Sequence, residues 1–271
     1  MSCDPLFSVE GRVVVVTGGM GQLGRRFCLA LRERGARVVV VDLAVDEARI
    51  EQRFGATCEN LLFIEADITQ SAALEQALRA VEAAWGAPQA LINNAAIDAP
   101  PEAPPEENGP FESYPESSWD RVMAVNTKGV FLATRTFGAA MARAGRGSIV
   151  NISSIYGMVS PDQRIYDYRR QSGEPFFKPI AYAASKSALQ NMTRYLATYW
   201  AASGVRVNTL TFAGVFNGQD PRFLERYCEH VPMGRMARED EYDAAVVFLV
   251  SDASSYMTGS NMIIDGGWTA W

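Results

Sequence analysis

Residues 12–24 read RVVVVTGGMGQLG, and a second valine run follows at residues 37–43, RVVVVDL. Valine favours β-strands, and a run that is apolar at every position indicates a strand buried on both faces, as in a parallel sheet. The first run ends in a glycine-rich turn, after which residues 22–34 have the pattern of a helix that stops at Gly35. Strand, glycine turn, helix and strand in this order indicate a βαβ unit of the kind that can hold a dinucleotide.

The alternation of apolar runs with helical stretches continues to the end of the chain. It predicts further strands at 60–64, 89–92, 148–152, 205–210 and 262–264, and helices at 45–54, 71–85, 116–144 and 181–202. Strands that alternate with helices favour a parallel sheet covered on both faces. We therefore predict an α/β fold, in which residues 1–271 form a single Rossmann-type domain with a doubly wound, seven-stranded parallel sheet.

Two stretches interrupt this alternation and are predicted to be loops. Residues 98–115 contain six prolines, and residues 158–179 are polar and aromatic. Both follow strands, and in open α/β sheets ligands bind beyond the carboxyl ends of the strands. We expect both segments to border a substrate; the alternative is that either is a surface or subunit-contact insertion.

Charge and cysteine content exclude several classes of function. The chain has 25 Lys and Arg against 31 Asp and Glu, a net charge of −6, which is unfavourable for binding nucleic acid. Four widely spaced cysteines and one histidine argue against a zinc site and fit a reducing compartment. The N-terminus lacks the features of a signal peptide, and the aliphatic runs are too short to span a bilayer. We expect a cytoplasmic protein that binds no metal, membrane or nucleic acid.

The glycine turn and the end of the second valine run together predict a nucleotide site. Glycines allow backbone N–H groups to approach a pyrophosphate at the start of a helix. Asp42 comes 18 residues after Gly24, where a carboxylate can bind the adenosine ribose and repel a 2′-phosphate. The turn holds no Arg or Lys, so NAD is expected rather than NADP. The alternative is a solvated aspartate at a strand end.

Motifs along nearly the whole chain resemble those of the short-chain dehydrogenase/reductase family. The turn fits the family's T-G-x-x-x-G-x-G in part, since Gly21 stands one place early and Gln22 replaces the middle glycine. The other matches are Ala66-Asp67-Ile68, Asn93-Asn94-Ala95-Ala96, Asn126, Ser153-Ser154, the Y-x-x-x-K motif Tyr182-Ala183-Ala184-Ser185-Lys186, and Asp265-Gly266-Gly267. Two departures concern the substrate side: Tyr182 follows Ser154 by 28 residues, and Phe212-Ala213 replaces a Pro-Gly pair.

The resemblance implies an NAD(P)-dependent oxidoreductase (EC 1.1.1.-) that interconverts a secondary alcohol and a ketone by hydride transfer, working as a homotetramer or homodimer. The implied catalytic residues are Asn126, Ser154, Tyr182 and Lys186. The implied cofactor-binding residues are Gly18, Gly21, Gln22, Leu23, Gly24, Asp42, Leu43, Asp67, Ile68, Asn94, Ala95, Ala96, Tyr182, Lys186 and Val215.

The spacing of Tyr182 and Lys186 suits acid–base chemistry. A tyrosine with a pKa of about 10 can take a proton near neutral pH only if that pKa falls. Lys186 stands one helical turn later on the same face, where its ammonium would favour the phenolate. Ser154 would hydrogen-bond the reacting oxygen, and Asn126 would hold a water that links the lysine to solvent. The alternative is a core aromatic residue beside a solvated amine.

The residues that border the expected site indicate a polar substrate. Arginine suits phosphates and carboxylates, and the overall pattern is similar to family members of surface-sugar and flagellin-glycan biosynthesis and to gluconate-type dehydrogenases. We expect a sugar, sugar phosphate or sugar acid, with residues 219–230 as a mobile lid. The expected contacts are Ser154, Arg164, Tyr166, Arg169 and Gly214, with Tyr168 and Arg170 nearby. The alternatives are a 3-oxoacyl or other carbonyl reductase and a non-catalytic nucleotide-sensing protein.

Overall fold

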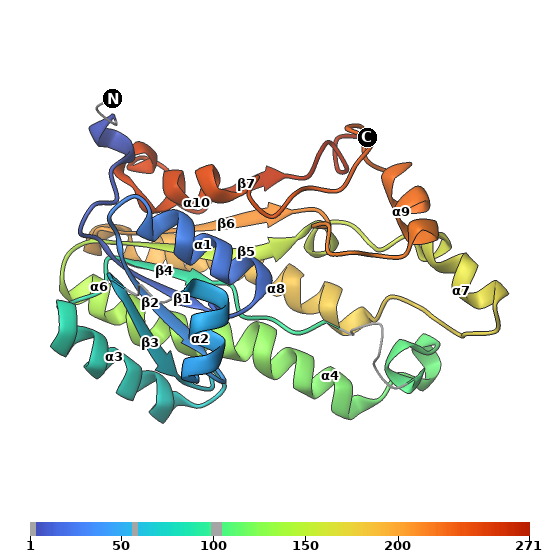
Figure 1. Cartoon of the computed structure of the whole chain (residues 1–271), viewed down its shortest axis with the longest axis horizontal. Coiled ribbons are helices and arrows are strands. Elements are labelled where there is room, and N and C mark those ends of the chain that lie inside the picture. The colour runs from blue at the N-terminus through green and yellow to red at the C-terminus, as the bar shows by residue number, and fades with distance from the viewer. Residues whose placement is uncertain (1–3, 56–58, 99–104) are drawn as a thin grey trace.

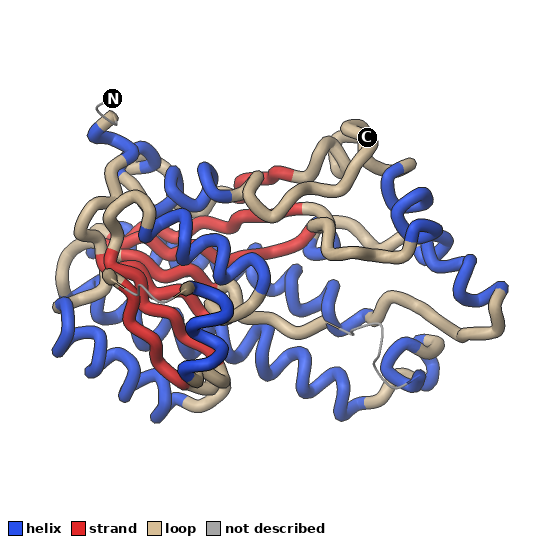
Figure 2. Tube along the Cα trace, in the orientation of Figure 1, coloured by secondary structure: helices blue, strands red, loops and turns tan. Residues whose placement is uncertain are grey.

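The computed structural model describes residues 4–55, 59–98 and 105–271. These residues form a parallel sheet of seven strands in the order β3-β2-β1-β4-β5-β6-β7 (Figures 1 and 2). The strands are β1 (Val13–Thr17), β2 (Arg37–Asp42), β3 (Leu61–Glu65), β4 (Ala90–Asn93), β5 (Gly147–Ser154), β6 (Val205–Phe212) and β7 (Asn261–Ile264). The predicted doubly wound α/β sheet is confirmed, and β5 and β6 each extend two residues beyond their predicted ends.

Helices cover both faces of the sheet (Figure 1). The described α-helices are α1 (Gln22–Arg32), α2 (Glu47–Phe54), α3 (Ser71–Trp85), α4 (Glu116–Met123), α5 (Val130–Ala133), α6 (Ala139–Arg143), α7 (Asp167–Gln171), α8 (Ile180–Trp200), α9 (Pro221–Cys228) and α10 (Asp243–Val250), of which α7 and α9 lie beyond the ends of the strands. None of the described helices is long and apolar enough to cross a membrane.

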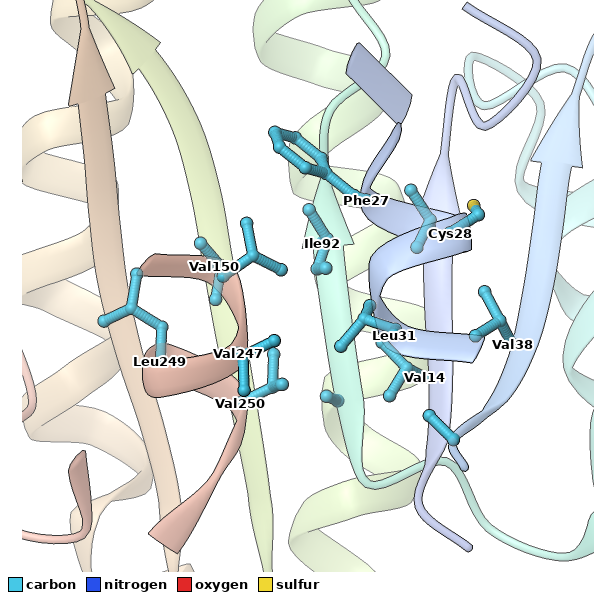
Figure 3. Packing of buried hydrophobic residues seen from close by; sticks show 14 of the residues in the cluster. Val14, Phe27, Cys28, Leu31, Val38, Ile92, Val150, Val247, Leu249 and Val250 are labelled. Atoms are coloured by element: carbon cyan, nitrogen blue, oxygen red, sulfur yellow. The ribbon is translucent and has the colours of Figure 1, made fainter. Parts of the chain in front are cut away.

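The alternation of side chains along β1 divides the core in two. Val14 and Val16 pack on one face, in a cluster that includes Phe27 of α1 and Val247 of α10 (Figure 3). Val13 and Val15 point to the opposite face, into a cluster with residues of α3 and α8. Successive residues of a strand point to opposite faces of the sheet, so a run of four valines fills both clusters at once.

Two helical features differ from the sequence-based expectation. The helix predicted at 116–144 is interrupted by π-helical turns at Ala124–Gly129 and Thr134–Gly138. Helix α10 was missed because its sequence, DAAVVFLV, is apolar on nearly every side; a helix buried all round lacks the periodicity that identifies an amphipathic one.

The parallel register places the carboxyl ends of all seven strands at one edge, and the irregular segments gather there. Residues 105–115 and 158–179, together with α7 and α9, lie beyond the arrowheads of β5 and β6 (Figure 1). Parts of both segments predicted as loops are helical: short 3₁₀ turns occur at Pro105–Asn108, Phe111–Ser113 and Gln163–Tyr166, and α7 follows. The strand order reverses between β1 and β4 at this same edge, where such sheets bind ligands.

The buried face of α3 gives a direct test of this packing. Leu74 is fully buried between α3 and the sheet, whereas Glu75 is exposed beside it. Leu74→Ala should lower the free energy of unfolding by about 2–5 kcal/mol, because it leaves a cavity in a packed core. Glu75→Ala should change it by about 0.5 kcal/mol or less. Urea unfolding of both variants measures the difference, and equal losses would contradict the packing described here.

Candidate active site

An open cleft of about 1650 Å³ lies at the carboxyl edge of the sheet. Its lining includes the glycine turn, the ends of β2, β5 and β6, and the segment 158–179. Of the residues predicted for the site, the following line it: Gly18, Gly21, Gln22, Leu23, Gly24, Asp42, Leu43, Asp67, Ile68, Asn94, Ala95, Ala96, Ser154, Tyr166, Arg169, Tyr182, Gly214 and Val215. No group of His, Cys, Asp and Glu suited to a metal ion occurs in the described part of the chain.

The turn after β1 is packed so tightly that it requires glycine at two positions. Gly18 has a φ of +64°, and a Cβ there would stand 2.7 Å from the Cα of Ala95. A Cβ on Gly24 would stand 2.0 Å from the Gly18 carbonyl oxygen. The side-chain amide of Asn94 donates to the carbonyls of Thr17 and Gly18, each at 3.1 Å. The turn is thereby fastened to the chain that leaves β4.

This turn fits a pyrophosphate. Helix α1 begins after Gly21, where no side chain caps the helix, and uncapped N–H groups at a helix start favour an anion. Gln22 donates from its amide nitrogen to the Phe216 carbonyl at 3.2 Å, which joins the turn to the loop after β6. In that loop, Val215 pairs with Ala237 in an isolated parallel bridge.

Asp42 presents a fixed carboxylate to the cleft at the end of β2. One oxygen accepts a hydrogen bond from the Met20 N–H and the other from the Leu43 N–H, both at 2.8 Å. The backbone therefore orients this group without consuming every lone pair, since an ionised carboxylate can accept about four hydrogen bonds. A carboxylate in this place fits a ribose diol.

Ser154, Tyr182 and Lys186 come together where β5 ends against α8. The Ser154 hydroxyl lies near the Tyr182 hydroxyl, where it favours the phenolate and so acts to lower the tyrosine pKa. Lys186 lies behind them, with its Nζ 5.7 Å from the centre of the Tyr182 ring and 2.9 Å from the Ile152 carbonyl, to which it donates. Lys186 is buried and does not line the cleft.

Burial determines the protonation states of Tyr182 and Lys186. It raises the pKa of Tyr182 above its ordinary value and lowers the pKa of Lys186 to about 8, while the Asp98 carboxylate raises both. The sequence predicted a lowered tyrosine pKa, and the structure corrects this: desolvation of the phenolate is the dominant effect. Tyr182 is therefore protonated at neutral pH, and it becomes a base only when further positive charge enters the site.

Asn126 is buried and does not line the cleft. It lies in the π-helical turn that begins at Ala124, and its amide both accepts from the Ile97 N–H and donates to the Ile97 carbonyl, at 2.8 Å. It also donates to the Ser185 hydroxyl at 3.0 Å. Asn126 thus links the chain after β4 to α8. Its expected role of binding a water molecule beside Lys186 stays a prediction.

The arginines expected to bind substrate are neutralised by nearby acids. Arg164 does not line the cleft; its side chain is 83% exposed and is paired with Asp162 at 2.7 Å. Arg169 lines the cleft but is paired with Glu174 at 2.7 Å. Arg170 is likewise paired with an acid, Asp167. The structure therefore offers fewer free positive charges than the sequence suggested.

Aromatic side chains form the substrate-side wall, and most of them were missed. Those that line the cleft are Tyr156, Tyr166, Tyr168, Phe176, Phe223 and Tyr227. Tyr227 accepts a hydrogen bond from the Gly214 N–H at 2.5 Å. The Tyr156 hydroxyl is buried with no hydrogen-bond partner among the described residues. The spacing of Phe223 and Tyr227, four residues apart, was the available signal, because such residues share one face of a helix.

The predicted lid, residues 219–230, contains α9 and rests on the segment 158–179. The Phe223 ring lies 5.7 Å from that of Tyr166, and the Arg222 guanidinium lies 4.7 Å from the centre of the Tyr168 ring. His230 Nε2 is 3.1 Å from an Asp162 oxygen. These contacts hold α9 over the cleft; its mobility stays a prediction.

The buried lysine makes stability depend on pH. Lys186 has a pKa of about 8 in the folded protein against an ordinary 10.5, so between pH 8 and 10 the unfolded chain binds more protons than the folded one. The free energy of unfolding should therefore rise with pH in this window, by at most about 1.4 kcal/mol per pH unit from this group. Lys186→Met should remove that slope, whereas Lys128→Met, at an exposed position, should keep it. Denaturant titrations at several pH values measure both; a wild-type slope in Lys186→Met would contradict the pKa described here.

Comparison with known proteins agrees with this geometry. Residues 18–269 match the family model described as Enoyl-(Acyl carrier protein) reductase. The chain is 35% identical to galactitol 2-dehydrogenase (L-tagatose-forming) of Cereibacter sphaeroides, with 100% of both chains covered.

Solved structures agree as well. The fold superposes with a TM-score of 0.84 on a short-chain dehydrogenase from Leptospira borgpetersenii with bound NAD+, at 30% identity over 99% of this chain and 97% of that one. The TM-score is also 0.84 for a gluconate 5-dehydrogenase from Burkholderia cenocepacia in complex with NADP and tartrate, at 26% identity over 98% of both chains. With its glycine turn, its Ser154–Tyr182–Lys186 group and these full-length matches, the chain belongs to the short-chain dehydrogenase/reductase family of NAD(P)-dependent oxidoreductases.

Proposed function

We propose that this oxidoreductase is an NAD-dependent dehydrogenase that converts a secondary hydroxyl of a neutral polyol or sugar into a ketone. The observation that carries the proposal is that Ser154 and Tyr182 lie together at the cleft, with Lys186 buried one helical turn after Tyr182. The 35% identity with a galactitol 2-dehydrogenase supports a polyol as substrate.

The charges around the cleft favour a neutral substrate. Arg169 is paired with Glu174, and Arg222 with Asp220 at 2.8 Å, all four residues lining the cleft. A phosphate or carboxylate would have to displace one of these acids to gain an arginine. A sugar acid is the second candidate, because the structural neighbour from Burkholderia cenocepacia is named a gluconate 5-dehydrogenase.

In the proposed reaction each residue of the site has a separate role. When bound, the oxidised nicotinamide cofactor supplies the hydride acceptor and a positive charge. Ser154 holds the substrate oxygen. Tyr182 first releases its own proton to solvent, and its phenolate oxygen then receives the proton that leaves the substrate hydroxyl. The Lys186 ammonium, charged below pH of about 8, stabilises the tyrosine oxygen as it exchanges that proton. The carbon loses a hydride and the oxygen a proton, so the alcohol becomes a ketone.

The family is commonly oligomeric, and we propose a homodimer or homotetramer in the cytoplasm. Exposed apolar side chains occur on neighbouring helices, namely Trp119 of α4, Phe131 of α5, and Ile180, Tyr195 and Tyr199 of α8. Tyr195 and Tyr199 stack on each other, with ring centres 6.0 Å apart. Exposed apolar patches of this kind are typical of interfaces.

Removal of the Tyr182 hydroxyl tests the activity. In an assay of NAD reduction with neutral polyols and sugars, Tyr182→Phe should lower kcat by about 10²–10⁴-fold, because it removes the group that accepts the proton. A fluorescence titration with NAD checks that the variant still binds the cofactor, so that the loss is one of turnover. Tyr195→Phe, on the outer side of the same helix, serves as the control. Full turnover by Tyr182→Phe would refute the assignment, and NAD binding with no turnover by the wild type on any substrate would favour a sensing protein.

Replacement of the Asp42 carboxylate tests the cofactor preference. Asp42→Asn keeps an oxygen acceptor but removes the charge that repels a 2′-phosphate, so the ratio of kcat/KM for NADP to that for NAD should rise about tenfold or more. Glu47→Gln makes the same change of charge at an exposed position on α2 and should leave the ratio unchanged. A wild type that prefers NADP would contradict the proposal.

A further inference from the structure

Asp98 and Lys178 form an ion pair at the edge of the cleft, beside the catalytic tyrosine. Asp98 follows β4, and Lys178 stands near the end of the segment 158–179, so the pair joins the two irregular segments. The Lys178 Nζ lies 5.0 Å from the centre of the Tyr182 ring. Neither residue belongs to the family motifs or to the substrate contacts expected from the sequence.

The backbone of Lys178 is held firmly in place. The Gln163 side chain accepts from the Lys178 N–H at 2.8 Å and donates to the Lys178 carbonyl at 3.1 Å. The neighbouring Phe177 N–H donates to the Asn108 carbonyl at 2.7 Å, which links the two irregular segments a second time. These bonds fix the main chain from which the Lys178 side chain reaches Asp98.

The pair keeps hydrogen-bonding capacity for a ligand in the cleft. The side chains of Lys178 and Asp98 are 12% and 37% exposed, so water reaches the lysine poorly. An ammonium has three N–H donors, and one ion pair does not use them all. The Asp98 carboxylate also acts on the reacting groups, since it raises the pKa of both Tyr182 and Lys186.

We propose that the Asp98–Lys178 pair determines specificity for neutral polyhydroxylated substrates over anionic ones, an inference that rests on the dehydrogenase activity proposed above. A substrate hydroxyl can donate to Asp98 and accept from Lys178 without adding charge to the cleft. A carboxylate attracted to Lys178 meets the charge of Asp98 at the same place. Asp98 is thus the repulsive element that excludes acids, and specificity commonly needs such an element.

The sharpest test is a gain of function. The full-length protein is assayed with NAD on galactitol, a neutral hexitol, and on gluconate, a six-carbon acid. Asp98→Asn leaves Lys178 with an unopposed charge, so the ratio of kcat/KM for gluconate to that for galactitol should rise on the order of 10–100-fold. Because both substrates share the Tyr182 step, a general change in the reactivity of that residue cancels in the ratio. Asp162→Asn is the matched control, since Asp162 is likewise paired with a basic side chain, that of Arg164, but does not line the cleft.

Lys178→Met provides a second, independent test. It should raise KM for galactitol on the order of tenfold, with a smaller effect on kcat, because it removes a donor to the substrate and no group that takes the proton. It should not increase the gluconate ratio. This variant keeps the inference testable if Asp98→Asn fails to fold.

Each outcome bears on one proposal or on both. If the wild type oxidises galactitol but Asp98→Asn leaves the ratio unchanged, or Lys178→Met leaves KM for galactitol unchanged, the pair is only structural and the inference fails while the dehydrogenase function stands. If the wild type prefers gluconate, or oxidises neither substrate, both the inference and the neutral-polyol function fail. A shifted ratio in Asp98→Asn with no shift in Asp162→Asn supports both.

Discussion

The close approach of two backbone segments, the turn after β1 and the chain leaving β4, is the constraint on which the rest of the structure depends. Space for a single methyl group is lacking at Gly18 and at Gly24, and the Asn94 amide closes the gap with hydrogen bonds to two carbonyls. This contact lies where the order of strands reverses. It thereby leaves the start of α1 open to the cleft and directs the chain from β4 toward Asn126 and Asp98.

The second constraint is the burial of the catalytic lysine. An ammonium away from water loses hydration that one carbonyl partner does not restore, and the lowered pKa of Lys186 reflects that loss. Tyr182 experiences the same environment with the opposite effect on its pKa. The site thus holds a tyrosine that stays protonated at neutral pH and a lysine with a pKa of about 8. The pKa values of both residues respond strongly to any charge that enters the site. Because water is excluded from the site, electrostatic interactions there are strong, and the Asp98 carboxylate raises the pKa of both residues.

The sequence predicted the sheet well because its signals are local. Four consecutive valines indicate a buried strand, and the glycine turn, Asp42 and the Tyr182–Lys186 spacing all follow from single segments. Features that depend on burial, or on contacts between residues far apart in the sequence, could not be predicted from it. Helix α10 lacks a polar face to reveal its period. The sign of the Tyr182 pKa shift depends on desolvation, which no spacing reports. Arg164 turns away from the cleft because Asp162, two residues earlier, holds its guanidinium.

The ion pair beside Tyr182 is a further feature that the sequence alone could not predict, and it bears directly on the choice of substrate. Asp98 and Lys178 are 80 residues apart in sequence, and each taken alone is an ordinary charged residue in a loop. Only the fold shows that the segments after β4 and β5 bring the Asp98 carboxylate and the Lys178 ammonium together. The arginines of the segment 158–179 suggested an anionic substrate when counted alone; counted together with Asp98, Asp162, Asp167 and Glu174 they do not. Because a cleft recognises a substrate by the charges that remain unpaired, the partners of those arginines decide what it can bind.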